Sequence, residues 1–218
     1  MHLKRHQVPK NWPIKRKGTL YVVRPNSRLS NGIPILIALR DVLKLAQNRK
    51  EVKKIISNKQ ILLNGFPVKD EKNSLSLFDV LTIVPSKEIY KLTLSEKGKF
   101  VIEKADYEKR DFKICKVVNK KILKGKKVQL NLSDGRNFIS NISCKVNDSV
   151  LVNLNKKKID KCLPLKEKAR VLVFAGKHSG KKAKISKLDL EKKTAELDYK
   201  EGKINVLIKQ LMVIEENE

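Results

Sequence analysis

Lysine and arginine are the side chains with which this chain is best equipped to do chemistry. There are 50 of them against 23 Asp and Glu, which gives a formal net charge of +27 at pH 7. Such an excess opposes compaction and indicates a polyanionic partner. Nucleic acid is the first candidate, because cations that meet phosphates release condensed counterions. A membrane surface is the alternative, but no apolar run approaches the ~18 residues of a spanning helix.

The other reactive side chains form no catalytic or metal-binding pattern. Cys115, Cys144 and Cys162 are odd in number and widely spaced, so they predict neither a disulfide framework nor a CxxC pair. The three histidines share no ligand spacing with them, and the carboxylates are scattered singly among lysines. We therefore expect no catalytic residue, no metal, no cofactor and no small-molecule substrate.

The most basic stretch opens the chain. "HLKRHQVPKNWPIKRKGTL", His2 to Leu20, has six Lys or Arg and no acid, and Asp41 is the first acid of the sequence. Repeated prolines and glycines leave room for short extended pieces but no long helix. We expect a basic arm over residues 1–34 that orders against phosphates, with Trp12 able to stack or anchor. A solvated tail is the alternative.

The opening stretch does not resemble a targeting signal. It lacks the apolar region of a secretory signal, and its proline pattern fits no amphipathic transit peptide. We therefore place the chain in the cytoplasm, without a membrane partner. The opposite terminus is acidic, with Glu215, Glu216 and Glu218.

Two short helices are predicted after the arm. Pro34 suits a first helical turn, and apolar residues then recur at helical period: Leu36, Leu39, Leu43 and Ala46, widened by Val42 and Leu45. A second helix begins after Asn48, an N-cap with Glu51 three residues later. The two apolar faces would pack together and turn a cationic ridge outward. This ridge comprises Arg40, Lys44, Arg49, Lys50, Lys53 and Lys54.

A strand at Ile61–Leu63 and a returning strand at Leu77–Val84 complete a predicted unit over residues 35–85. Asn64-Gly65 between them is a strong tight-turn signal. The stretch "LRDVLKLAQNRKEVKKIISNKQILLNGFPV…LFDVLTI" resembles the small RNA-binding domain of ribosomal protein S-four and of several RNA-modifying enzymes. Among its residues, those that fall on the motif's positions are Arg40, Arg49, Lys53, Asn64 and Gly65.

The middle of the chain, residues 86–165, reads as a small β-barrel or sandwich. Short apolar runs lie at Phe112–Val118, Val128–Leu132 and Ser149–Leu154. Asp134-Gly135, in "NLSDGRN", is a turn signal. "NKKKIDK" is a charge run typical of a solvated face.

The last segment, residues 166–218, carries a sharper pattern. In "ARVLVFAGKHSGKKAKISKL", glycines at 176 and 180 bracket a basic turn between two strands. A phosphate-binding P-loop fails on spacing, because the second glycine comes one residue early and Lys182 stands where Ser or Thr is needed. The stretch resembles instead the KOW motif, which implies RNA binding within a small barrel. An ordinary basic hairpin is the alternative.

These stretches occur in one order along one chain, and together they resemble the archaeal and eukaryotic type of small-subunit ribosomal protein S-four. The resemblance implies a structural, non-enzymatic protein of the ribosome that binds small-subunit ribosomal RNA and neighbouring ribosomal proteins. It implies an α+β, multi-domain fold: arm, small α/β domain, central β-barrel-like domain and KOW barrel. Gln47-Asn48 departs from a site often basic in the family, and the short C-terminus suggests the archaeal type.

Two other classes compete with this reading. One is an RNA-modifying enzyme, such as a pseudouridine synthase or a tyrosyl-tRNA synthetase; the other is a transient elongation or recycling factor. The residues we expect to contact RNA are His2, Lys4, Arg5, His6, Lys10, Trp12, Lys15, Arg16, Lys17, Arg40, Lys44, Arg49, Lys50, Lys53, Lys54, Asn64, Gly65, Arg136, Lys177, His178, Ser179, Lys181 and Lys182.

Overall fold

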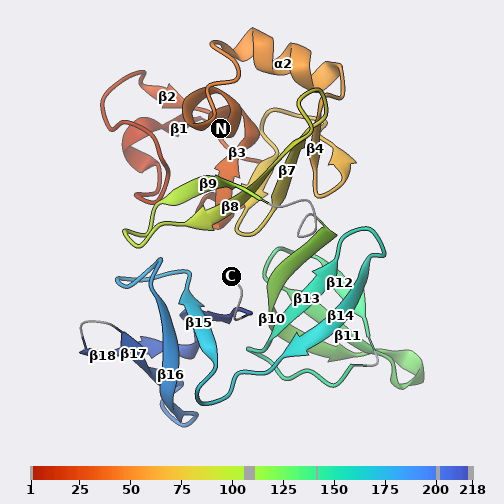
Figure 1. Cartoon of the computed structure of the whole chain (residues 1–218), viewed down its shortest axis with the longest axis vertical. Helices are drawn as coiled ribbons and strands as arrows, with labels where there is room; N and C mark the ends of the chain where they lie inside the picture. The colour runs from red at the N-terminus through yellow and green to blue at the C-terminus, as the bar shows by residue number, and fades with distance from the viewer. Residues whose placement is uncertain (1, 106–110, 141, 200–201, 216–218) are drawn as a thin grey trace. The chain divides into compact units, whose positions relative to one another are not determined.

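Short antiparallel strands dominate the structure, a computed structural model that describes residues 2–105, 111–140, 142–199 and 202–215 (Figure 1). The chain divides into two units, one formed by residues 1–94 and 99–111 and the other by 95–98 and 112–218. The fold is mainly β with few helices. The short apolar runs form strands as predicted, but the helical part is smaller than the expected α+β class implies. Of the acidic C-terminus, Glu216 and Glu218 lie outside the described residues. In the described part of the chain, no helix has the length and apolarity to cross a membrane.

The first unit contains three small sheets. Strands β1 and β2 pair in the arm, β3 pairs with β6, and the third sheet has the order β5-β4-β7-β8-β9. The strands are β1 Leu3–Lys4, β2 Tyr21–Val22, β3 Gly32–Pro34, β4 Ile61–Leu63, β5 Phe66–Pro67, β6 Ser74–Ser76, β7 Val80–Ile83, β8 Glu88–Leu94 and β9 Phe100–Lys104.

The first predicted helix is shorter and wider than expected. Helix α1 covers Ile35–Ile37 and continues as a π-helical turn over Ala38–Val42. The extra residue in that turn rotates the later side chains. Leu45 lies beyond the end of the helix and is exposed, although the helical period predicted it to be buried. Lys44 lies beyond the helix end at a φ of 54°, so it does not share a helical face with Arg40.

The second helix follows its sequence signal. Helix α2 covers Arg49–Ser57, and the side-chain oxygen of Asn48 accepts a hydrogen bond from the Glu51 N–H at 3.0 Å. The Glu51 carboxylate accepts in return from the Gln47 N–H at 2.7 Å. Val52 and Ile56 are buried. The predicted N-cap and the predicted apolar face are therefore confirmed.

The Asn-Gly turn is confirmed, but the returning strand is shorter than predicted. Asn64 and Gly65 have φ values of 52° and 83°, as the tight β4–β5 turn requires. The returning strand β7 begins at Val80 instead of Leu77, because Phe78 turns the chain at a φ of 62°. Asp79 holds this turn by accepting from the Ser76 N–H at 2.6 Å.

The sheet of the first unit extends past the domain boundary that we expected at residue 85. Strand β8 pairs with β7 from Lys91↔Val80 to Glu88↔Ile83, and β9 pairs with β8 in turn. These strands bury Ile89 in the same unit. The hairpin ladder therefore joins β8 and β9 to the small α/β domain.

The arm packs against the first unit through its one tryptophan. The Trp12 side chain is 2% exposed, and its indole N–H donates to the Leu29 carbonyl at 3.2 Å. The Asn11 carbonyl next to it accepts from the Phe100 N–H at 2.8 Å. Buried aromatic surface contributes strongly to packing. Trp12 therefore acts as the anchor of the arm.

Trp12 fluorescence tests this packing directly, because it is the only tryptophan of the chain. We expect the free protein to emit at shorter wavelength than the urea-unfolded protein and to resist acrylamide quenching, since burial shields the indole. Steady-state emission and quenching of the full chain measure this. Emission and quenching equal to those of the unfolded chain would instead support a solvated tail.

The second unit contains two five-stranded antiparallel sheets, with the orders β12-β11-β10-β13-β14 and β18-β17-β16-β15-β19. Short 3-10 helices cover Lys124–Lys126 and Ile208–Gln210. The strands are β10 Phe112–Ile122, β11 Val128–Leu132, β12 Asn137–Ile139, β13 Ser149–Asn153, β14 Lys158–Leu163, β15 Arg170–Val173, β16 Lys182–Asp189, β17 Thr194–Tyr199, β18 Gly202–Leu207 and β19 Leu211–Val213.

Each sheet of the second unit has its own core. One core includes Cys115, Leu130 and Val150, and the other includes Val171 and Leu211. The buried side chains of each core come almost entirely from the strands of a single sheet. The apolar runs predicted at Val128–Leu132 and Ser149–Leu154 correspond to β11 and β13.

Lys116 connects the two sheets of the second unit. It lies on β10, and its ammonium group donates to the carbonyls of Ile208 at 2.5 Å and Leu211 at 2.8 Å. Ser149, directly opposite on β13, accepts from the Val213 N–H at 2.8 Å. Burial lowers the pKa of Lys116 to about 8. The two carbonyl oxygens oppose this by stabilising the charged form.

Lys116→Met tests this arrangement through the pH dependence of stability. The folded pKa of Lys116 lies below its unfolded value, so the folded state loses its proton first as pH rises above about 8. The free energy of unfolding should therefore rise between pH 8 and 10.5, by at most about 3 kcal/mol. Lys116→Met should lack this rise. Urea unfolding of both full chains measures the difference, and parallel pH profiles would contradict it.

Candidate nucleic-acid interface

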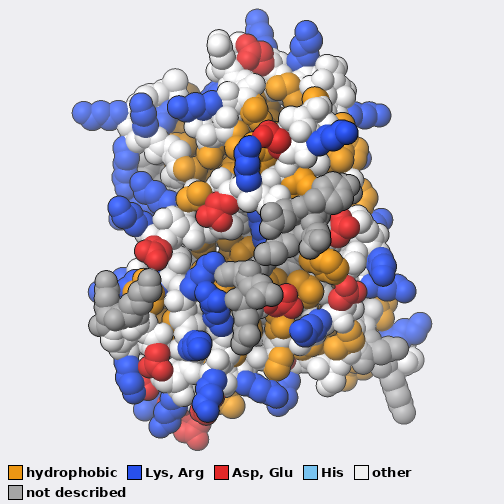
Figure 2. All heavy atoms as spheres, viewed as in Figure 1, with side chains coloured by type: hydrophobic (Ala, Val, Ile, Leu, Met, Phe, Trp, Pro, Cys, Tyr) orange, Lys and Arg blue, Asp and Glu red, His pale blue; other side chains and the backbone are white. Residues whose placement is uncertain are grey.

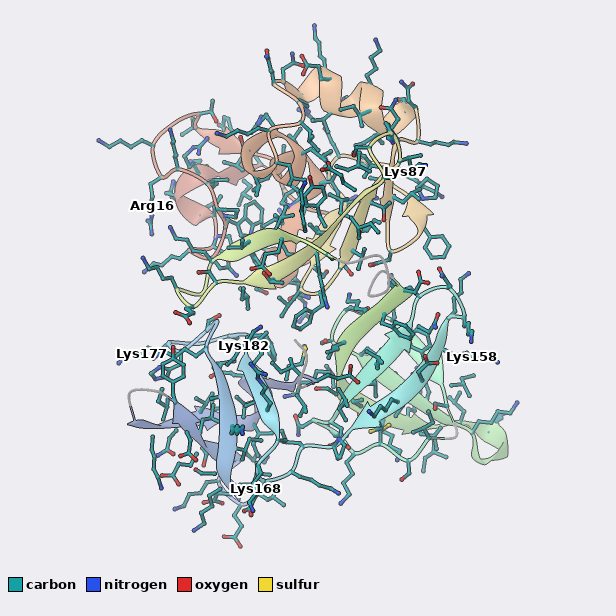
Figure 3. All side chains as sticks on the ribbon, in the orientation of Figure 1. Arg16, Lys87, Lys158, Lys168, Lys177 and Lys182 are labelled. Atoms are coloured by element: carbon teal, nitrogen blue, oxygen red, sulfur yellow. The ribbon has the colours of Figure 1, made fainter. Side chains whose placement is uncertain are left out.

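The arm presents a row of exposed cations. Lys4, Lys10, Lys15, Arg16 and Lys17 are all exposed, and so are the rings of His2 and His6 beside them. Figure 3 shows Arg16 on the arm, on the opposite side of the first unit from Lys87. Exposed Lys and Arg side chains bind phosphates without reading sequence. These seven side chains are therefore accessible to a phosphate, and their contact with RNA stays a prediction.

Arg5 is used differently, because its guanidinium group closes the arm into a loop. It donates to the Lys15 carbonyl at 2.7 Å, and to the Thr19 carbonyl and hydroxyl at 2.7 and 2.8 Å. Most of its donors are therefore satisfied within the protein. Arg5 positions the neighbouring exposed cations, although we predicted it to contact RNA itself.

The cationic ridge is present along helix α2. Lys50, Lys53 and Lys54 are exposed, and so is Lys44 just before the helix. Arg40 makes a bidentate ion pair with Asp41, at 3.0 and 2.9 Å. The hydrogen bonds to that carboxylate raise the pKa of Arg40. Asp41 therefore compensates part of the positive charge of Arg40.

Arg49 links the ridge to the interior. Its guanidinium group hydrogen-bonds Glu71, whose side chain is only 2% exposed while that of Arg49 is 53% exposed. The hydrogen bonds raise the pKa of Arg49. A buried carboxylate is costly unless it is paired. Arg49 therefore neutralises Glu71 with one edge and leaves the other edge exposed.

A groove of about 1430 Å³ lies between the arm and the helices of the first unit. Seven Lys or Arg line it, against one acid, Asp41. Arg24, Arg49 and Lys72 are among these cations, and the exposed aromatic ring of Tyr21 is also in the lining. The groove therefore has the charge of a phosphate-binding surface.

Two predicted contact residues are buried in this structure. Trp12 has no ring face available for a base, because it anchors the arm. Asn64 is 4% exposed; its amide donates to Asp79 at 2.8 Å and accepts from the Val80 N–H at 3.0 Å. Both side chains stabilise the fold. We correct their assignment from RNA contact to structural support, while Gly65 in the same turn is exposed.

In the second unit, Arg136 belongs to a charged cluster. Asp134 lies 3.2 Å from the buried Lys113 and 3.6 Å from Arg136. Burial of Asp134 raises its pKa, but the charge and hydrogen bond of Lys113, together with the N–H and the charge of Arg136, outweigh burial and lower the pKa of Asp134. Arg136 is half-buried and pairs within the protein, so only part of its guanidinium group faces solvent.

Lys177, in the loop between β15 and β16, and Lys182, the first residue of β16, are exposed (Figure 3). The loop turns at Gly176 and Gly180, both with a φ of 91°, a region that favours glycine. His178 and Ser179 are half-buried, and the Ser179 hydroxyl donates to the Phe174 carbonyl at 3.2 Å. The Lys181 ammonium lies 4.3 Å from the centre of the Tyr199 ring, a cation–π contact.

In Figure 2, Lys and Arg side chains are scattered over both units among hydrophobic and other polar surface, with fewer acids among them. Nothing in this distribution resembles a catalytic centre. Among the residues that the structure describes, no group of three or more His, Cys, Asp or Glu side chains could hold a metal ion. The site is therefore an extended charged surface.

Comparisons with known proteins agree with this surface. Residues 86–159 match the model described as ribosomal family S4e, and residues 1–27 match the RS4NT domain. The chain is 34% identical to small ribosomal subunit protein eS4 of Methanothermobacter thermautotrophicus, over 98% of this chain and 91% of the relative. It is 36% identical to eS4 of Nanoarchaeum equitans, over 83% and 79%.

The chain belongs to the S4e family of ribosomal proteins. A solved structure supports the fold: the 30S ribosomal protein S4e from Thermoplasma acidophilum matches with a TM-score of 0.71 and 27% identity. The match covers 84% of this chain and 94% of that one. As a member of a family of structural ribosomal proteins, the S4e chain is not an enzyme.

Three residues that line the groove between the arm and the helices were not predicted from the sequence: Tyr21, Arg24 and Lys72. Arg24 lies in the basic arm, but its run of β-forming neighbours gave no reason to select it. Lys72 stands in a mixed-charge loop, and Tyr21 in an apolar run that predicts a strand. Only the folded arm brings the three to one groove.

Replacing Arg49 separates its two roles. Arg49→Leu leaves Glu71 buried without a counter-ion, so we expect a loss of about 2 kcal/mol in stability together with weaker RNA binding. Arg49→Leu/Glu71→Leu should regain most of the stability, because no buried charge is left. Urea unfolding and RNA titration of both variants measure these effects.

The double variant decides whether Arg49 contacts RNA. If it binds RNA as tightly as the unmodified chain, the role of Arg49 is to pair with Glu71, and its assignment as an RNA contact fails.

Proposed function

We propose that this S4e chain is a structural constituent of the small ribosomal subunit, where it binds ribosomal RNA and adjoins other ribosomal proteins. The observation that carries the proposal is the similarity to eS4 over 98% of the chain. The net charge of +27 supports an RNA partner. The location that follows is the ribosome in the cytoplasm.

Three surfaces of the chain serve this function. They are the arm over residues 1–34, the ridge along α2, and the loop between β15 and β16. We infer that the sheet containing this loop acts as a KOW-type barrel and that the sheet of β10–β14 acts as a second, β-barrel-like module. Together these modules bind separate RNA elements, because ribosomal RNA is recognised by shape, 2′-hydroxyls and unpaired bases.

Salt dependence tests the electrostatic basis of binding. Affinity of the purified chain for small-subunit ribosomal RNA should fall steeply as salt rises, with a slope of about 0.9 per phosphate neutralised on duplex RNA. A triple variant of the ridge, Lys50→Gln/Lys53→Gln/Lys54→Gln, should lower the slope by about 2 to 3. Filter binding over a range of salt concentrations measures both.

The matched control removes the same charge from the turn between β13 and β14. Lys156, Lys157 and Lys158 are exposed there and belong to the run that reads as a solvated face. Their change to Gln should leave the slope nearly unchanged. Affinity that ignores salt overturns the proposed function, whereas equal effects of the two triple variants overturn the ridge assignment.

Presence in the subunit is the second requirement. The protein should be stoichiometric in salt-washed small subunits, and ultraviolet crosslinks should concentrate in residues 2–17, in residues 40–54 and around residues 177–182. Loss of the protein in the salt wash would indicate a transient factor instead.

A further inference from the structure

We propose that the groove between the arm and the helices of the first unit binds an unpaired RNA segment, with its phosphates on the basic wall and one base stacked on Tyr21. This inference rests on the proposed function and specifies the form of RNA that one site takes. Neither the family match nor the comparisons assign a ligand to this groove.

The size of the groove favours an oligonucleotide strand. Its volume of about 1430 Å³ exceeds the range of roughly 300–1,000 Å³ typical of small-molecule sites. A duplex hides its bases and is read mainly along its phosphates and minor groove. A single strand can place both phosphates and bases inside a groove, as strands do in basic channels with aromatic platforms.

Two cations of the groove are available for phosphates. Arg24 and Lys72 are exposed and line the groove from opposite segments, the arm and the loop before β6. Within the described residues, no ion pair engages either side chain. Arg40 and Arg49, by contrast, share their charge with Asp41 and Glu71. Arg24 and Lys72 therefore present less compensated charge than Arg40 and Arg49, as do Lys15 and Lys17 of the arm, which also line the groove.

Tyr21 supplies the stacking surface. In the β1–β2 pair, Lys4 stands opposite Tyr21 and Leu3 opposite Val22. Side chains alternate between the faces of a strand, so the burial of Leu3 directs Tyr21 outward. The Tyr21 side chain is 53% exposed, and the His2 ring lies 5.3 Å away at 49°. Hydrogen bonds from Arg5 to the neighbouring Thr19 fix this part of the arm.

The first experiment compares two probes on the full chain: a short fluorescein-labelled RNA strand without self-complementarity, and a duplex with the same number of phosphates. We expect Tyr21→Leu to weaken binding of the strand about tenfold, the effect of losing one base–aromatic stack. Its effect on the duplex should be less than about twofold, and Tyr21→Phe, which keeps the ring, should bind both probes normally.

The second experiment tests the basic wall against a charge-matched control. Arg24→Gln/Lys72→Gln should lower the salt slope for the strand by about 1.4, since each contact with a single strand contributes about 0.7. The control is Lys59→Gln/Lys87→Gln, which removes the same charge from exposed positions of this unit outside the groove lining. The control should lower the salt slope by less than half of the change expected for Arg24→Gln/Lys72→Gln.

The outcomes separate the two proposals. If small-subunit ribosomal RNA still binds but Tyr21→Leu leaves the strand affinity unchanged, or weakens strand and duplex alike, the groove inference is overturned and the proposed function stands. Equal slopes for the two double variants also overturn it. If no RNA binds at all, both proposals fail. Trp12 emission of each variant verifies that the arm is still packed.

Discussion

Repulsion among fifty Lys and Arg side chains is the constraint that shapes this molecule. A single large core would bury a larger fraction of the chain's surface, and many of these side chains with it. Several small sheets leave more surface exposed for the same buried apolar area. The few lysines that the structure buries each have compensation. Lys113 pairs with Asp134, Lys116 donates to two carbonyls, and Lys91 lies 5.0 Å from the ring centre of Phe78. The other Lys and Arg side chains whose burial the structure describes lie at least partly at the surface, where an RNA can neutralise them.

Local signals in the sequence predicted local structure well. Asn48 caps α2 because the side-chain oxygen of an Asn just before a helix can accept a hydrogen bond from a free N–H of the first turn. Asn64-Gly65 turns the chain because both residues adopt positive φ readily. The strand at Val128–Leu132 agrees with its apolar run to the residue. Each of these features depends on neighbours a few positions away, which a sequence displays directly.

Features that depend on distant contacts could not be predicted in this way. The π-helical turn at Ala38–Val42 interrupts the α-helical period that the apolar residues follow in the sequence. Within its basic stretch of sequence, Trp12 is a plausible residue to stack on a base. In the structure it is buried, with its indole N–H bonded to the Leu29 carbonyl and the neighbouring Asn11 carbonyl bonded to the Phe100 N–H. Lys116 looks like one lysine in a basic strand, and its partners lie more than ninety residues later. The same holds for the site: exposed cations were predicted, but their grouping with Tyr21 into a groove was not.

The contact between Lys116 and the Ile208 and Leu211 carbonyls has a consequence for biosynthesis. Translation proceeds from the N-terminus, and segments emerge in order. Strand β10 is made early in the second unit, but the two carbonyls and β19, which completes the sheet beside β15, are made last. Until β19 has been made, the Lys116 ammonium lacks these two carbonyls and the edge of β15 is open. The second unit can thus close only after β19 has left the ribosome, and a chain that stops before β19 would leave an unpaired strand edge for quality-control proteases to recognise.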